Sequence, residues 1–105
     1  MTPSRAVGLT EREWDAHVRA LAELLGWRRY HTFRSTHSPA GWPDLALVRP
    51  PRLILAELKS DTGKLTPTQT EWLELLSQCP GVETYVWRPR DAQTVADVLS
   101  RRRHR

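Results

Sequence analysis

The fold is decided by residues 44–59, which read DLALVR, then PP, then RLILAELK. The two runs, 44–49 and 53–59, are apolar at nearly every position and are separated by Pro50-Pro51. Runs that are apolar on both faces are typical of the central strands of a sheet. We therefore expect two adjacent antiparallel strands with the prolines at the tip of their connection.

This pairing predicts which side chains face each other. If the prolines form the tip, Arg49 lies opposite Arg52, and counting back along the ladder places Asp44 opposite Glu57. Directly opposed residues have Cβ atoms about 5 Å apart. Two carboxylates this close repel by about 3 kcal/mol at an effective dielectric constant near 20, so a positive charge is expected between them.

Two kinds of positive charge can meet that need. Lys59 follows Glu57 by two positions and shares its strand face. The oxygens of two carboxylates also suit a hard divalent cation such as Mg2+, which can activate water against a phosphate. The alternative is a structural Glu-Lys pair and a surface Asp44, because Pro-Pro is not a standard two-residue turn and a slip of one residue would separate the carboxylates.

The first predicted helix offers two further acids, Glu11 and Glu13. At 100° per residue Glu11 lies on the apolar stripe that contains Trp14, whereas Glu13 points away from it. Glu13 is also placed to close a capping box with Thr10. Glu11 is therefore the preferred site carboxylate, and favourable charge at a helix start is its alternative explanation.

The remaining elements follow from periodicity, caps and turns. Thr66 caps a helix with a Pro at its first position, and Gln69 both fits a capping box and points inward, where it could orient Lys59 or water. Asp91 is expected to cap the last helix. The expected order is α-β-β-β-α-β-α, an α/β domain whose mixed central sheet is flanked by helices. The predicted segments are a tail 1–9, helix 10–26, strand 27–34, loop 35–41, helix 66–79, strand 82–88, a C-terminal helix ending near 100, and a basic tail 101–105.

Composition favours a single cytoplasmic domain that binds a polyanion. The 105 residues contain one cysteine, Cys79, and neither a signal-peptide pattern nor an apolar run long enough for a membrane. The net charge is +4, and only two of the sixteen basic side chains are Lys. Such a balance fits a nucleic-acid partner, although a GC-rich genome also enriches arginine. The residues expected to contact DNA phosphates are His31, Ser35, Thr36, Ser38 and Lys64.

The segment Gly41-Trp42-Pro43-Asp44, followed after twelve residues by Glu57-Leu58-Lys59, resembles the PD-(D/E)XK nuclease signature. A wider series is similar to the stand-alone VRR-NUC domain of phages and bacteria, with Trp42 standing where Phe or Val is more usual. That series comprises Glu11, Gly26-Trp27, Tyr30-His31-Thr32, Ser35, the two segments above with Leu45, Gly63 to Thr66, Gln69, Trp72-Leu73 and Val86 to Pro89.

The resemblance implies a restriction-endonuclease-like α-β-β-β-α-β core and a metal-dependent endodeoxyribonuclease. Asp44, Glu57 and the Leu58 carbonyl would bind Mg2+ or Mn2+, Lys59 would be catalytic, and Glu11 and Gln69 would assist, with Glu11 as a further ligand. It also implies a homodimer that acts on branched DNA such as Holliday junctions, in repair or recombination, in a bacterial or phage-infected cell, without an organic cofactor or a membrane.

Three alternatives stay open at this stage. One is a sequence-directed or nicking endonuclease on ordinary duplex DNA. Another is a non-catalytic DNA-binding accessory on the same fold, which would have no need of a carboxylate-carboxylate-lysine set. The third is a toxin or protein-interaction module that uses surface tryptophans, but Trp14 and Trp72 lie at helix positions that are expected to face the core.

Overall fold

The computed structural model describes residues 8–31, without the side chain of His31, and residues 40–101. The element order is the predicted one, with a short 3-10 turn added before the last helix. The end of the predicted strand 27–34 and most of the predicted loop 35–41 lie outside the described residues. The elements are α1 (Glu11–Leu24), β1 (Arg28–His31), β2 (Leu45–Arg49), β3 (Arg52–Leu58), α2 (Pro67–Ser77), β4 (Val82–Trp87), η2 (Pro89–Asp91) and α3 (Ala92–Ser100).

The four strands form one mixed sheet in the order β1-β2-β3-β4. β1, β2 and β3 are antiparallel to their neighbours, whereas β4 lies parallel to β3 after the crossover through α2. Arg49 pairs with Arg52, and Leu45 pairs with Ala56. The predicted register is therefore confirmed, and one further step along the ladder places Asp44 opposite Glu57.

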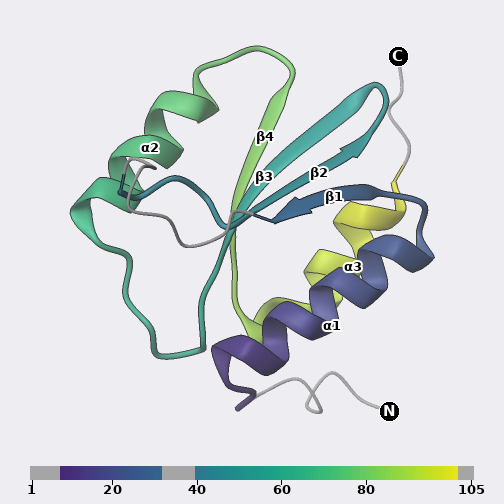
Figure 1. The fold of residues 1–105 in the computed structure, drawn as a ribbon, viewed down its shortest axis with the longest axis horizontal. Coiled ribbons are helices and arrows are strands. Elements are labelled where there is room, and N and C mark those ends of the chain that lie inside the picture. Colours follow the sequence, from purple (N-terminus) through teal and green to yellow (C-terminus); the bar gives the residue numbers. More distant parts are fainter. Residues whose placement is uncertain (1–7, 32–39, 102–105) are drawn as a thin grey trace.

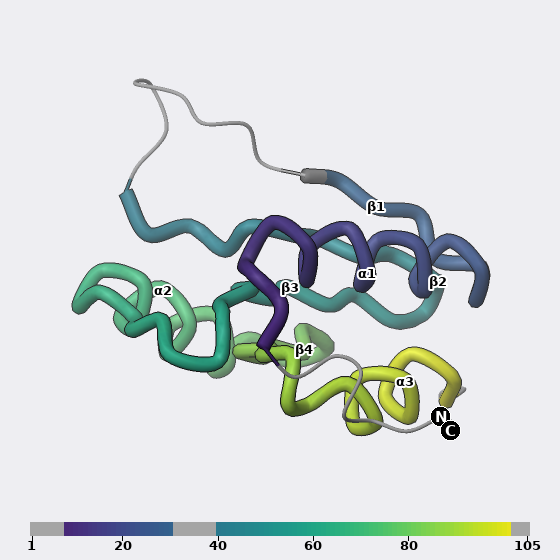
Figure 2. The backbone as a smooth tube through the Cα atoms, turned by 90° about the horizontal axis from the view of Figure 1, so that it is seen from below, coloured from purple at the N-terminus to yellow at the C-terminus, as the bar shows by residue number. Residues whose placement is uncertain are grey.

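The helices cover both faces of the sheet. Figure 1 shows α1 and α3 on one side and α2 on the other, and Figure 2 shows the strands following one another from β1 to β4. The main core lies on the α1 and α3 side, where Trp14, Leu47 and Ile54 are fully buried. In the part of the chain that the structure describes, no helix is both long and apolar enough to cross a membrane.

Two arginines that face each other in the sheet hold the end of α3 against it. The guanidinium groups of Arg49 and Arg52 lie 4.6 and 5.0 Å from the ring centre of Trp27. Arg49 donates to the Leu99 carbonyl at the end of α3, and Arg52 forms a 2.7 Å ion pair with Glu83. Part of the arginine content therefore stabilises the fold, because Arg49 satisfies a carbonyl that the end of α3 leaves free and Arg52 neutralises Glu83.

The sheet face on the α2 side is less completely covered. α2 packs mainly on β4, and on β1 and β2 the side chains of Tyr30 and Val48 remain 65% and 40% exposed.

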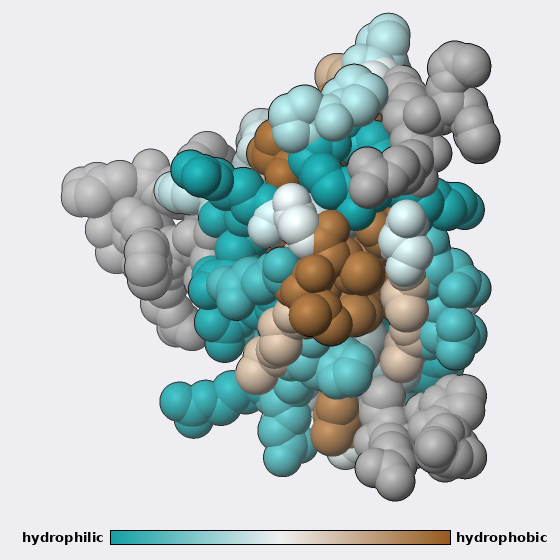
Figure 3. Space-filling model, turned by 90° about the vertical axis from the view of Figure 1, so that its right-hand side faces the viewer, coloured by the Kyte–Doolittle hydropathy of each residue, from teal (hydrophilic) through white to brown (hydrophobic). Residues whose placement is uncertain are grey.

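Figure 3, which views the side that carries the end of α1, shows hydrophobic residues gathered at its middle among hydrophilic ones. Leu24, at that end of α1, is 80% exposed.

Candidate active site

Two carboxylates meet where β2 begins and β3 ends. Glu57 is only 2% exposed. Burial raises the pKa of the Glu57 carboxyl to about 8, and the negative charge of the neighbouring Asp44 acts in the same direction. Lys59 opposes this rise, and Glu11 adds to it. The carboxylates thus lie close enough to share a proton or a cation.

The two oxygens of Glu57 have different surroundings. Oε2 accepts a 2.9 Å hydrogen bond from Nε2 of Gln69, whereas Oε1 is buried without a hydrogen-bond partner among the described residues. An unpartnered buried carboxylate oxygen is costly and marks a position for an ion or water.

Gln69 has both of the roles that its position suggests. Its Oε1 accepts from the Thr66 amide at 2.9 Å, and the capping box of α2 is complete. Its Nε2 donates to Glu57, whereas Lys59 or water was expected as its partner. The same side chain therefore starts α2 and orients a carboxylate of the site.

Asp44 lies immediately before β2 and reaches the end of β3. Its Oδ2 accepts a 3.3 Å hydrogen bond from the amide of Leu58. Pro43, just before it, is buried. The Asp44 side chain is therefore held beside the backbone that carries Glu57 and Leu58.

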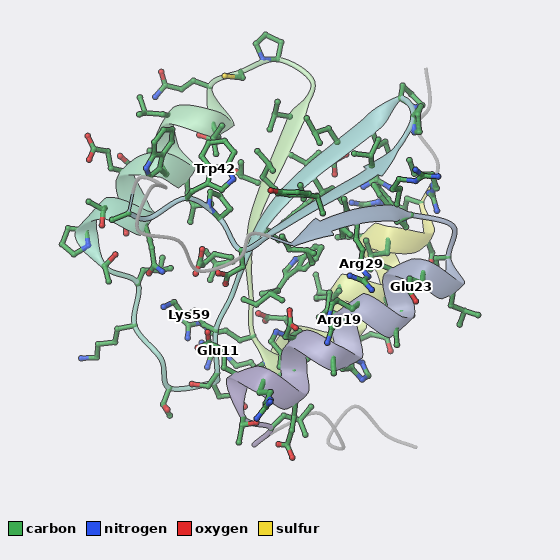
Figure 4. All side chains as sticks on the ribbon, in the orientation of Figure 1. Glu11, Arg19, Glu23, Arg29, Trp42 and Lys59 are labelled. Atoms are coloured by element: carbon green, nitrogen blue, oxygen red, sulfur yellow. The ribbon has the colours of Figure 1, made fainter. Side chains whose placement is uncertain are left out.

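The segment that leads to Asp44 is anchored on α2. The indole of Trp72 donates to the Ala40 carbonyl at 3.0 Å and contacts Trp42 edge to face, with ring centres 5.0 Å apart. Gly41 passes so close to α2 that a Cβ atom there would lie 2.7 Å from the Thr68 backbone. Figure 4 shows Trp42 lying against α2. Trp72 is half-buried and lies outside the main core. The prediction that it faces the core is therefore wrong, and Trp72 instead anchors the segment before Asp44.

The first turn of α1 borders the same site. A hollow of about 280 Å³ is lined by Glu11, Arg12, Asp15, Asp44 and Leu58. Glu13 instead completes the capping box with Thr10, as expected from its place as the third residue of the helix. Sequence reasoning missed Arg12 and Asp15, although Asp15 follows Glu11 by four residues and therefore shares its helix face.

Lys59 follows the last residue of β3. Its amide donates to the Trp87 carbonyl at 3.1 Å, and the Trp14 indole donates to the same carbonyl at 2.9 Å. This shared acceptor ties α1 to the ends of β3 and β4. Figure 4 shows Lys59 and Glu11 in the same region, and both charges act on Glu57.

The VRR-NUC domain model matches residues 6–91, which include every site residue described above. The chain belongs to the VRR-NUC family. VRR-NUC domains are nucleases with a restriction-endonuclease-like fold, so the chain is a nuclease domain with DNA as its substrate, and the fold agrees. Neither a curated protein nor a solved structure matches the chain.

The donor set of this VRR-NUC domain fits a hard divalent cation. Oxygen atoms of Asp44 and Glu57 converge, and Oε1 of Glu57 lacks a partner within the described segments. Across residues 8–31 and 40–101, no three His, Cys, Asp or Glu side chains form a ready metal cluster. Carboxylates that leave most positions to water are the ligands Mg2+ prefers.

The predicted DNA contacts of the VRR-NUC domain are described only in part. Lys64 is exposed in the connection between β3 and α2. The backbone of His31 ends β1. Ser35, Thr36 and Ser38 lie outside the described residues.

Proposed function

We propose that this chain is a divalent-metal-dependent endodeoxyribonuclease that cuts branched DNA, such as a Holliday junction, as a homodimer. The observation that carries the metal-dependent chemistry is the buried carboxylate of Glu57 beside Asp44, with one oxygen unpartnered among the described residues. A purely DNA-binding domain would have no use for such a costly arrangement.

In this proposal Asp44, Glu57 and the Leu58 carbonyl hold Mg2+ or Mn2+, and Glu11 adds a carboxylate from α1. The bound cation would polarise the scissile phosphate and lower the pKa of water. Gln69 supports the arrangement by fixing Oε2 of Glu57, which leaves Oε1 for the ion. An outer hydrogen bond of this kind orients a metal ligand.

Lys59 acts on the phosphate and the attacking water. Its ammonium group stabilises the negative charge that develops on the phosphate oxygens and orients the water for in-line attack. The water oxygen forms a bond to phosphorus as the bond to the 3′ oxygen breaks. The attacking water gives up a proton to solvent, and the leaving 3′ oxygen takes up a proton from solvent, so a 5′ phosphate and a 3′ hydroxyl result.

The substrate is tested by incubating the protein with a labelled four-way junction, a flap, a plain duplex and a single strand, each with Mg2+, Mn2+ or EDTA. We expect metal-dependent cleavage that is fastest on the junction. Equal cleavage of plain duplex would favour a duplex or nicking endonuclease. If none of the substrates is cleaved in a metal-dependent way, the proposed nuclease activity is refuted.

Replacing Asp44 by Asn tests the catalytic assignment directly. Asp44→Asn keeps the shape of the side chain and removes its charge, so we expect the cleavage rate to fall at least about 100-fold. Asp97→Asn is the matched control, because Asp97 is an exposed residue of α3. Cleavage by Asp44→Asn as fast as by the parent would contradict the assignment.

A further inference from the structure

Asp61 joins three segments that are distant in the sequence. It lies between β3 and α2, two residues after Lys59, and its side chain is 20% exposed. Oδ2 accepts from the amide of Gly8 at 3.1 Å, and Oδ1 accepts from the amide of Arg90 at 2.9 Å. One carboxylate thus connects the approach to α1, the loop after β3 and η2.

The loop that carries Asp61 is held from its other side as well. The guanidinium of Arg90 donates to the Asp61 carbonyl at 2.8 Å, and that of Arg88 donates to the Ser60 carbonyl at 2.8 Å. Since Arg88 follows β4 directly and Arg90 lies in η2, the loop is fixed to the end of β4 and to the turn that follows it. Asp61 therefore offers Gly8 a firm attachment point.

Both ends of this connection lie next to site residues. Gly8 precedes Glu11 by three residues, and Lys59 precedes Asp61 by two. One turn further along α1, the Trp14 indole shares the Trp87 carbonyl with the Lys59 amide. The first turn of α1 is thus attached to the end of β3 on both sides of Glu11.

We propose that Asp61 is a positioning residue of the nuclease site, which holds Glu11 at the start of α1 in place beside Lys59 at the end of β3. The inference rests on the roles proposed above for Glu11 and Lys59. Reacting groups must be held to within a fraction of an ångström, so a loose first turn would lower the chemical rate more than substrate binding.

A double-mutant cycle tests the proposal. We would compare the parent chain, Asp61→Ala, Glu11→Gln and the double variant by single-turnover and steady-state cleavage of the junction. We expect Asp61→Ala to lower kcat about 10-fold with KM changed less than about 2-fold. In the Glu11→Gln background the Asp61→Ala change should lower kcat less than about 2-fold, because the carboxylate that Asp61 positions is no longer present. Asp97→Ala is the matched control and should leave kcat unchanged.

A second readout does not depend on cleavage. Calorimetric titration with Mn2+ should show weaker binding for Asp61→Ala than for the parent, and no such difference in the Glu11→Gln background. If Asp61→Ala does not fold, as judged by its thermal transition, Asp61→Asn replaces it, since it keeps one acceptor oxygen.

An equal loss of kcat in both backgrounds would overturn the proposal, because Asp61 would then act on stability alone. An unchanged kcat in Asp61→Ala would overturn it as well. Failure of the proposed nuclease function looks different, because the parent chain itself would then cleave none of the DNA substrates.

Discussion

Glu57 sits in an environment that disfavours its own charge. Burial removes water from the carboxylate, and Asp44 adds a second negative charge beside it, so the pKa rises to about 8. Without a cation the folded chain therefore keeps a proton on this group near neutral pH. A bound divalent ion would displace that proton, so metal affinity should increase with pH.

The raised pKa predicts how stability depends on pH. The unfolded carboxyl releases its proton near pH 4.5 and the folded one near 8. In EDTA the free energy of unfolding should therefore fall as pH rises between these values, by at most about 1.4 kcal/mol per unit. Urea unfolding at several pH values measures this slope.

Glu57→Gln is the control for this prediction, because an amide does not titrate. The variant should lose the slope that Glu57 contributes. The prediction is wrong if parent and variant change in parallel with pH.

Some site contacts could be predicted from the sequence and others could not. The opposition of Asp44 and Glu57 followed from counting along a ladder, and the capping role of Glu13 followed from its spacing of three residues from Thr10. The bond from Gln69 to Glu57 depends on how α2 lies across the sheet. The attachment of Asp61 to Gly8 spans 53 residues. Such long-range contacts leave no periodic signal in a single sequence.

At the scale of elements, α2 contacts both of the segments that carry the site carboxylates. Its first turn bonds Glu57 through Gln69, and its second turn carries Trp72, which binds the segment before Asp44. The sequence predicted the cap and the extent of this helix to within about two residues. It also placed Asp91 at the start of α3, but the Asp91 side chain accepts from the Arg88 amide, because the turn η2 intervenes.

Trp72→Phe tests the anchoring of the segment before Asp44. Phe keeps an aromatic ring but cannot donate to the Ala40 carbonyl, so we expect about 1 kcal/mol lower stability. We also expect kcat to fall about 10-fold as Asp44 moves, with a smaller change in KM.

Leu75→Ala is the control for the Trp72 variant, since it trims a half-exposed side chain of the same helix. Thermal unfolding and cleavage of the junction would be measured on both variants. Equal kcat for Trp72→Phe and the parent would show that Asp44 is placed without this anchor.

At the scale of the whole molecule, the sheet has one densely covered face and one face that is partly open. Leu47 is fully buried, whereas Val48, the next residue of β2, is 40% exposed on the other face, near Tyr30. If the proposed homodimer forms, we expect a second copy to pack on this strip, because a two-fold contact would bury the same apolar surface on both copies.

A supercoiled plasmid with an extruded cruciform tests the dimer. Two sites in one assembly should cut both strands of the junction in one binding event and produce linear DNA directly. Gel analysis of the products, with sedimentation of the protein at the same concentration, measures this. Early accumulation of nicked circles by a protein of monomer mass would contradict the prediction.

The two hydrogen bonds made by the Gln69 amide group have a consequence for how the enzyme responds to heat. One amide group both secures the first turn of α2 and restrains Glu57. Helix ends fray before a domain melts, because local opening costs less free energy than global unfolding. Fraying of α2 would release Glu57 while the sheet is still intact. Warming should therefore inactivate the enzyme before it unfolds, so the temperature optimum should lie below Tm.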